Sequence, residues 1–184
     1  MPCKCSGSVG FIHFKCLKNW LELKVQPKQT GNIHSLYWRS FECEMCKNAY
    51  PYIFKVNDRV YKLVDMKRPE HPNYLIIESL PLERNSSRTV HMLTFTPGQT
   101  KFKMGRGHDS EVRVNDISVS RCHAIINYRP DGIYILDNRS KFGTLVLSKK
   151  ERIEIKQGSE FCFQIGRSVC SLRVQPIEYS LVNG

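Results

Sequence analysis

The spacing of the cysteines near the N-terminus constrains this chain more than any other feature. Five of its eight cysteines lie within the first 46 of 184 residues. Two thiols separated by one or two residues can hold one side of a metal ion, and a pair distant in sequence can complete a tetrahedron around zinc. Together with one histidine, these cysteines form three half-sites: Cys3 with Cys5, His13 with Cys16, and Cys43 with Cys46. Zinc is therefore the predicted cofactor, and free thiols at a frayed terminus are the alternative for the first pair.

The remaining sequence favours a protein that does not enter a membrane. No apolar run approaches the roughly 20 residues that a membrane span needs, and the first residues lack the apolar core of a secretory signal. We expect an intracellular protein, cytoplasmic or nuclear. In such a compartment, close cysteine pairs indicate metal rather than disulfides.

The net charge of +11 is spread along the chain rather than gathered in one basic stripe. A diffuse positive field suits acidic or phosphorylated partners in general. Specific nucleic-acid binding would instead require a concentrated basic surface. We therefore expect protein partners and no specific nucleic acid.

Local patterns divide the chain into a short helical segment and a long β-rich one. Leu17, Trp20, Leu21 and Lys24 recur at helical spacing and predict a helix over residues 14–24. Pro27 and the Gly31-Asn32 pair then predict a break. Residues 49–71 form a connector that contains one predicted strand at 50–56.

From residue 73 onward, short β-rich runs alternate with turn residues. About ten short strands at this spacing predict a β-sandwich, so the fold class is mostly β. The predicted strands cover residues 74–80, 90–96, 101–104, 112–114, 124–128, 133–136, 144–147, 152–155, 160–165 and 171–175.

The N-terminal pattern resembles a variant RING finger of the RING-CH type over residues 1–48. That family has eight ligands in the order four Cys, one His and three Cys, wound as a cross-brace around two zincs. Trp20 and Leu21 follow shortly after Cys16, and the family often has a tryptophan and a leucine just after its sixth ligand. The family's first Cys pair would lie before Met1, so the finger is expected to be incomplete. The resemblance assigns one shared four-thiolate zinc to Cys3, Cys5, Cys43 and Cys46, and leaves His13 and Cys16 as half a site.

Three motifs in the β-rich half resemble the forkhead-associated (FHA) domain over residues 72–176. They are Gly105-Arg106, Ser120-Arg121-Cys122-His123, and residues 138–144. An arginine fork and a serine hydroxyl are suited to a phosphate. The resemblance implies an FHA-type β-sandwich of about ten to eleven strands that binds phosphothreonine peptides.

The FHA resemblance also implies a role for each motif residue. It implies that Arg106 and Ser120 contact the phosphate and that Arg121 and Lys141 lie at the rim of the pocket. Phe142 stands where the family often has an asparagine that binds the peptide backbone, so an apolar peptide contact is expected there. The residues expected to support the pocket are Gly105, His123, Asn138 and Gly143.

Two functions follow from these resemblances. The first is an adaptor that binds phosphothreonine-containing proteins and zinc. The second is a ubiquitin-protein ligase, in which the finger recruits a ubiquitin-conjugating enzyme and the FHA domain recruits phosphorylated substrates. Such a ligase positions its reactants and needs no nucleophile of its own. The expected domains are residues 1–48, 49–71 and 72–176, followed by a tail at 177–184.

Overall fold

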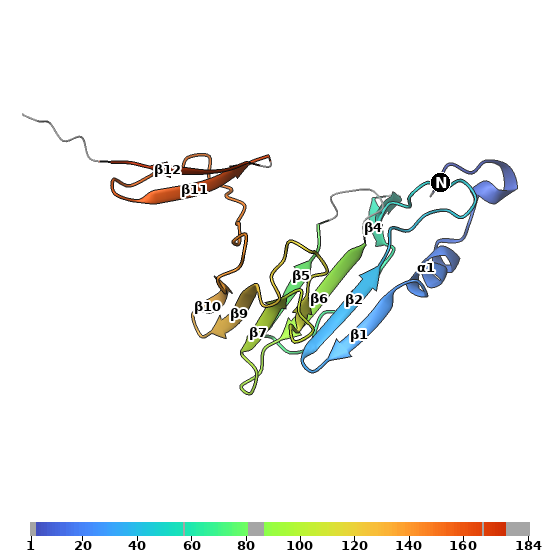
Figure 1. Cartoon of the computed structure of the whole chain (residues 1–184). Coiled ribbons are helices and arrows are strands. Elements are labelled where there is room, and N and C mark those ends of the chain that lie inside the picture. The colour runs from blue at the N-terminus through green and yellow to red at the C-terminus, as the bar shows by residue number, and fades with distance from the viewer. Residues whose placement is uncertain (1–2, 57, 81–86, 167, 176–184) are drawn as a thin grey trace, which may run out of the picture. The chain divides into compact units, whose positions relative to one another are not determined.

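The computed structural model describes residues 3–56, 58–80, 87–166 and 168–175 (Figure 1). The chain divides into two compact units, Met1–Phe142 and Gly143–Gly184. Each unit is built mainly from β-strands, and the described residues contain one α-helix. The elements of the first unit are η1 (Gly7–Gly10), α1 (Phe14–Glu22), β1 (Gln26–Thr30), β2 (Ile33–Trp38), β3 (Ile53–Val56), β4 (Arg59–Lys62), β5 (Tyr74–Glu78), β6 (Arg88–Thr94), β7 (Lys101–Gly105), β8 (Val112–Arg113), β9 (Ala124–Arg129) and β10 (Gly132–Asp137).

Helix α1 confirms the helix predicted after the second cysteine group. Leu17 and Leu21, four residues apart, lie on one face and are almost completely buried. The backbone N–H of Lys24 donates to the carbonyl of Leu21 and closes the C-terminal end. The helix thus anchors the zinc segment through one apolar face.

The hairpin formed by β1 and β2 contradicts the prediction of a break at residues 27–32. Gly31 adopts a left-handed φ of 53° at the turn, a conformation that glycine takes without a steric penalty. Pro27 fits because β1 is an edge strand, where one missing backbone donor is tolerated. The turn residues therefore join two strands instead of ending regular structure.

Strand β2 also pairs with β6, so the hairpin belongs to a four-stranded sheet of order β1-β2-β6-β5. The antiparallel register places Ile33 opposite Leu93 and Trp38 opposite Arg88. Figure 1 shows the blue hairpin beside the green strand β6. A strand from the cysteine-rich segment and strands from the β-rich segment thus form one central sheet.

Both faces of this central sheet are covered. On one face, Leu36 of β2 and Val90 of β6 join a core with Leu17 and Leu21 of α1. On the other face, the core is made by a different set: Ile33, Leu93, Phe95, Phe102, Val112 and Ile126. The second core lies between the central sheet and a sheet of order β10-β9-β7-β8, which is the sandwich arrangement that the sequence predicts. Burying each of these side chains contributes about 1.5–3 kcal/mol.

The second unit contains β11 (Glu160–Ile165) and β12 (Ser168–Arg173), which form an antiparallel pair. The strands predicted at 144–147 and 152–155 are wrong, because both runs lack regular structure. Val146 and Leu147 are more than four-fifths exposed. β-propensity reflects packing on a pleated, half-buried surface, and the described residues offer these runs no partner strand. Across the described ranges, no helix has the length and apolar character required to cross a membrane.

Candidate zinc centre and phosphopeptide site

Four thiols from two distant segments converge in the first unit. Their sulfur atoms all lie within 4.8 Å of one another, and the Sγ atoms of Cys5 and Cys43 are 3.6 Å apart. One pair comes from the N-terminal loop and the other from the turn at 43–46, which a β-bridge between Glu42 and Ala49 closes. The four residues are Cys3, Cys5, Cys43 and Cys46.

Hydrogen bonds favour the thiolate form of one of these sulfurs. The N–H of Cys46, the hydroxyl of Tyr50 and the N–H of Met45 lower the pKa of Cys43 to about 6. Hydrogen bonds with Cys3 and Cys43 raise the pKa of Cys5 to about 12. A cation at the centre would stabilise all four thiolates, since zinc binds the deprotonated form of cysteine.

The geometry fits zinc. Four Zn–S bonds of about 2.3 Å in a tetrahedron place the sulfurs roughly 3.8 Å apart, close to the separation of Cys5 and Cys43. Four thiolates are the soft donor set of structural zinc sites. Cys43 is buried and the other three are half-buried, so the centre is largely closed to solvent. Zinc at this site would tie the N-terminal loop to the 43–46 turn.

His13 and Cys16 lie outside this four-thiol group. His13 immediately precedes α1, and Cys16 lies in its first turn. Both side chains are exposed. No third ligand candidate joins them among the described residues, so their role as zinc ligands stays a prediction.

The predicted phosphate site is built where the end of β7 meets the loop before β9. The backbone N–H of Arg106 donates to the carbonyl of Ser120 at 3.0 Å, and its Nε donates to the carbonyl of Val119 at 3.1 Å. These bonds fix the stem of an otherwise exposed arginine. Gly105 permits this approach: a Cβ there would lie 2.2 Å from the carbonyl oxygen of Arg121.

Ser120 is held by two loops at once. Its Oγ accepts a hydrogen bond from the backbone N–H of Lys141 at 3.0 Å, which leaves the hydroxyl proton available to donate. Its own N–H donates to Nδ1 of His123 at 3.2 Å. The imidazole of His123 thus holds the backbone of Ser120 in place.

His123 and Asn138 also connect the loops around Ser120. The N–H of His123 donates to the carbonyl of Met104, and its Nε2 lies 3.9 Å from a carboxylate oxygen of Asp137. The side-chain amide of Asn138 donates to the carbonyl of Cys122 at 3.2 Å, and its backbone N–H donates to the carbonyl of His123. These bonds link the end of β7 to the loops before β9 and after β10.

The remaining predicted residues lie around this loop pair. Arg121 and Lys141 are exposed, and Lys141 Nζ lies 5.2 Å from the ring centroid of Phe142. Phe142 is 64% exposed, so an apolar ring faces solvent. Gly143 has a φ of 74°, a conformation that favours glycine.

Sequence reasoning missed four residues that shape the loops. Ser110 donates to the carbonyl of Arg121 at 2.8 Å, and Asp116 accepts from both the N–H and the hydroxyl of Ser118. The two bonds from Ser118 lower the pKa of Asp116. The Gly-Arg-Gly triplet ending at Gly107 was a usable signal, because a Cβ at Gly107 would also crowd the carbonyl of Arg121.

Two family models match the chain. The RING-variant domain matches residues 1–46, and the FHA domain matches residues 102–164. No solved structure is similar enough to the chain to count as a match.

Curated relatives match part of the chain. The E3 ubiquitin-protein ligase MARCHF7 of Rattus norvegicus is 39% identical over 46 residues, which cover 25% of this chain and 6% of that protein. MARCHF7 of Pongo abelii is 27% identical over 120 residues, 65% of this chain and 15% of its own length. The E3 ubiquitin-protein ligase marc-3 of Caenorhabditis elegans is 36% identical over 67 residues, 36% of this chain and 11% of its own length.

These matches thus cover only a small part of each relative. The four-thiol site lies inside the first matched domain, and the Arg106 and Ser120 loops lie inside the second. The chain therefore combines a zinc-binding RING-variant domain with a protein-binding FHA domain.

Proposed function

We propose that the chain is an adaptor that binds phosphothreonine peptides through its FHA domain. The observation that supports this best is the pairing of Arg106 with Ser120. One bond from its Nε to a loop carbonyl orients the guanidinium, and its terminal N–H groups remain for an anion. The Ser120 hydroxyl, whose oxygen already accepts from Lys141, supplies a second donor.

A phosphate held this way would gain charge-assisted hydrogen bonds from a preorganised arginine. Lys141 and Arg121, both exposed beside the loop, add positive charge at the rim. Phe142 offers an apolar surface to a neighbouring peptide side chain. The phosphate is thus recognised by Arg106 and Ser120. Phe142 sets the preference for the peptide residues beside the phosphothreonine.

Zinc would act structurally in this adaptor. Bound by Cys3, Cys5, Cys43 and Cys46, it would supply a cross-link between two chain segments. Cys43 belongs to the same core as Val90 of β6, so the cross-link would support the central sheet as well as the finger.

A second candidate function is that of a ubiquitin-protein ligase. The names of the curated relatives favour it, because the matched MARCHF7 and marc-3 proteins are E3 ubiquitin-protein ligases. In that function the RING-variant domain would bind a ubiquitin-conjugating enzyme, and the FHA domain would hold a phosphorylated substrate beside it.

Binding to a library of phosphothreonine peptides, followed by fluorescence anisotropy, tests the adaptor function. Arg106→Ala should weaken binding by about tenfold or more, the effect of losing hydrogen bonds to a charged group of roughly 1.5–3 kcal/mol. Arg106→Lys should weaken it too, because the planar fork is lost while the charge remains. Arg59→Ala, an exposed arginine on β4, is the matched control. Equal binding of phosphorylated and unphosphorylated peptides would refute the proposal.

Ubiquitin transfer with a panel of conjugating enzymes separates the two functions. A ligase should form ubiquitin conjugates that disappear when Cys43→Ser removes a zinc ligand. An adaptor should form none while still binding the peptide. Counting zinc in the purified protein adds a further test, since a value near two per chain would show that His13 and Cys16 also hold a metal.

A further inference from the structure

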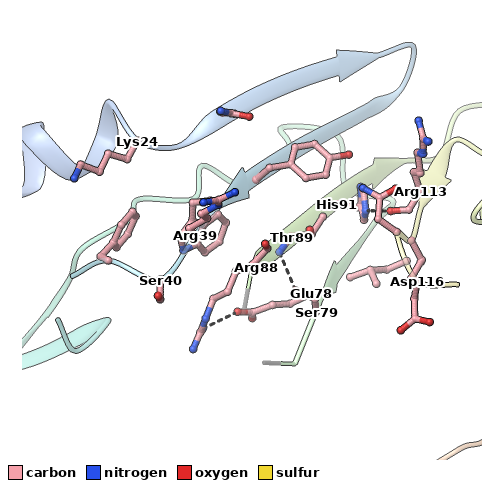
Figure 2. Close-up of a pocket in the computed structure, with 18 of the residues that line it drawn as sticks. Lys24, Arg39, Ser40, Glu78, Ser79, Arg88, Thr89, His91, Arg113 and Asp116 are labelled. Atoms are coloured by element: carbon pink, nitrogen blue, oxygen red, sulfur yellow. Dashed lines mark hydrogen bonds and ion pairs between the residues drawn. The ribbon is translucent and has the colours of Figure 1, made fainter. Parts of the chain in front are cut away.

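A cleft of about 970 Å³ opens at one end of the central sheet (Figure 2). Lys24 and residues 37–41 line it from the RING-variant side. The other side is lined by residues 77–79 at the end of β5, by residues 88–89 of β6 and by residues 113–116. The cleft depends on the pairing of β2, which lies in the RING-variant match, with β6, which lies between the two matched ranges.

The charges that line the cleft are unevenly matched. Four are positive, on Lys24, Arg39, Arg88 and Arg113, and two are negative, on Glu78 and Asp116. Glu78 lies 3.5 Å from Arg88, and Asp116 accepts from Ser118. Lys24 is paired as well, with Glu44 at 3.2 Å. The exposed Arg39 has no ion pair within the described part of the chain. The cleft therefore has an excess of positive charge.

Two buried donors in the cleft residues lack acceptors. Trp38 is 5% exposed, and its Nε1 has no hydrogen-bond partner among the described residues. The same holds for Nε of Arg113. Indole and guanidinium nitrogens can only donate, and buried polar groups without partners are uncommon. Both nitrogens are inaccessible to solvent, so they belong to the walls of the cleft and do not reach its opening.

The uncharged part of the lining combines polar side chains with apolar and aromatic ones, a mixture that suits a peptide better than a nucleic acid. Tyr37, Ile77 and Met104 contribute to the walls beside the charged residues. The rings of Trp38 and Phe41 stack on each other at 6.5 Å and are nearly fully buried. Binding of single-stranded nucleic acid uses exposed aromatic faces for the bases, and these two rings offer none.

We propose that this cleft binds an acidic peptide segment of a partner protein, with carboxylates toward Arg39 and Arg113 and an apolar side chain against Ile77 and Met104. This cleft contains neither Arg106 nor Ser120, although it shares Asp116 with the loop that precedes Ser120. A partner could therefore contact the chain at both places.

A fluorescein-labelled peptide of alternating Glu and Leu residues tests the proposal, with the whole chain titrated against it by anisotropy. The Arg39→Glu variant should weaken binding at least about fivefold, because one exposed attractive charge becomes repulsive. Arg59→Glu, with the same charge change on an exposed β4 residue outside the cleft, should bind within about twofold of the parent protein. In a Trp20→Phe background, Trp38 is the one remaining tryptophan, and its emission should shift as the peptide binds.

Several outcomes would overturn the proposal. Equal binding of a peptide with Gln in place of every Glu would show that charge plays no part. Equal losses in Arg39→Glu and Arg59→Glu would show a general charge effect and no cleft. Tighter, Arg39-dependent binding of an oligothymidine would favour nucleic acid. Arg106→Ala should leave the acidic peptide's affinity unchanged, so failure here is distinct from failure of the phosphothreonine site.

Discussion

Ser35 and His91 join the RING-variant domain to the β-rich half through a buried hydrogen bond of 2.7 Å between Oγ and Nδ1. The other ring nitrogen, Nε2, lies 3.2 Å from the carbonyl oxygen of Arg113 and must carry the proton that it donates. Nδ1 is then the acceptor for the Ser35 hydroxyl. One imidazole thus connects β2, β6 and β8, which come from three separate parts of the sequence.

We predict that Ser35→Ala destabilises the first unit by about 1–3 kcal/mol, because it leaves a buried ring nitrogen without a partner. Both Ser35 and His91 are 4% exposed, so water cannot easily replace the hydroxyl. Urea unfolding with saturating zinc measures the change. Ser8→Ala, in an exposed position of η1, is the control and should have little effect. An unchanged midpoint for Ser35→Ala would contradict the prediction.

The stability of the first unit should also fall as the pH drops below the ordinary histidine range. Burial lowers the pKa of His91, and the hydrogen bond to Arg113 opposes this only in part. The unfolded chain therefore takes up a proton near pH 6.5 that the folded chain resists. The stabilising contribution of the neutral ring is present above that pH and is lost below it.

His91→Gln removes this titration while leaving the other histidines in place. Unfolding free energies measured between pH 7.5 and 5.5 should fall less steeply for the variant than for the parent protein. Zinc must be held saturating in both, because acid also competes for the thiolates. Identical slopes would show that His91 does not contribute to the pH dependence.

The sequence predicted those elements whose local residue pattern indicates the same structure that the tertiary fold requires. Leu17 and Leu21 marked the helix, and the resemblance to the RING-CH finger implied the four thiols that the fold brings together. The hairpin at Gly31 was missed because Pro27 and Gly31 also read as breakers. What makes it a hairpin is the non-local pairing of β2 with β6, which no local pattern contains.

The same distinction applies to the predicted phosphate site. The motifs containing Arg106 and Ser120 could be found from residue types, but the hydrogen bond from Ser120 to His123 could not. The short β-rich run at 144–147 shows the opposite error. Its residues have strand propensity, yet propensity is realised only where a neighbouring strand and a packed face exist.

We predict that loss of zinc weakens the central sheet as well as the finger. Cys43 lies in the same core as Leu36, Val90 and Met92, so releasing the metal frees the chain that covers one face of β6. Cys43→Ser should lower zinc content and increase amide hydrogen exchange in β2 and β6. Cys162→Ser, an exposed cysteine in β11, is the matched control. Unchanged exchange in β6 after zinc loss would show that the two segments are energetically independent.

Finally, Gly105→Ala should disrupt the phosphate loop through the backbone alone. A Cβ at this position would lie 2.2 Å from the carbonyl oxygen of Arg121 and 2.8 Å from that of Ser120, and neither backbone atom can move without displacing the loop. Overpacking of this kind costs about 1–3 kcal/mol, and the displacement would break the bond between the Arg106 N–H and Ser120. Phosphopeptide affinity should therefore fall together with stability. Gly98→Ala, where a Cβ meets nothing within 4 Å, should change neither. Anisotropy and urea unfolding of both variants test this, and full peptide affinity in Gly105→Ala would show that the close approach of the two loops is not required for binding.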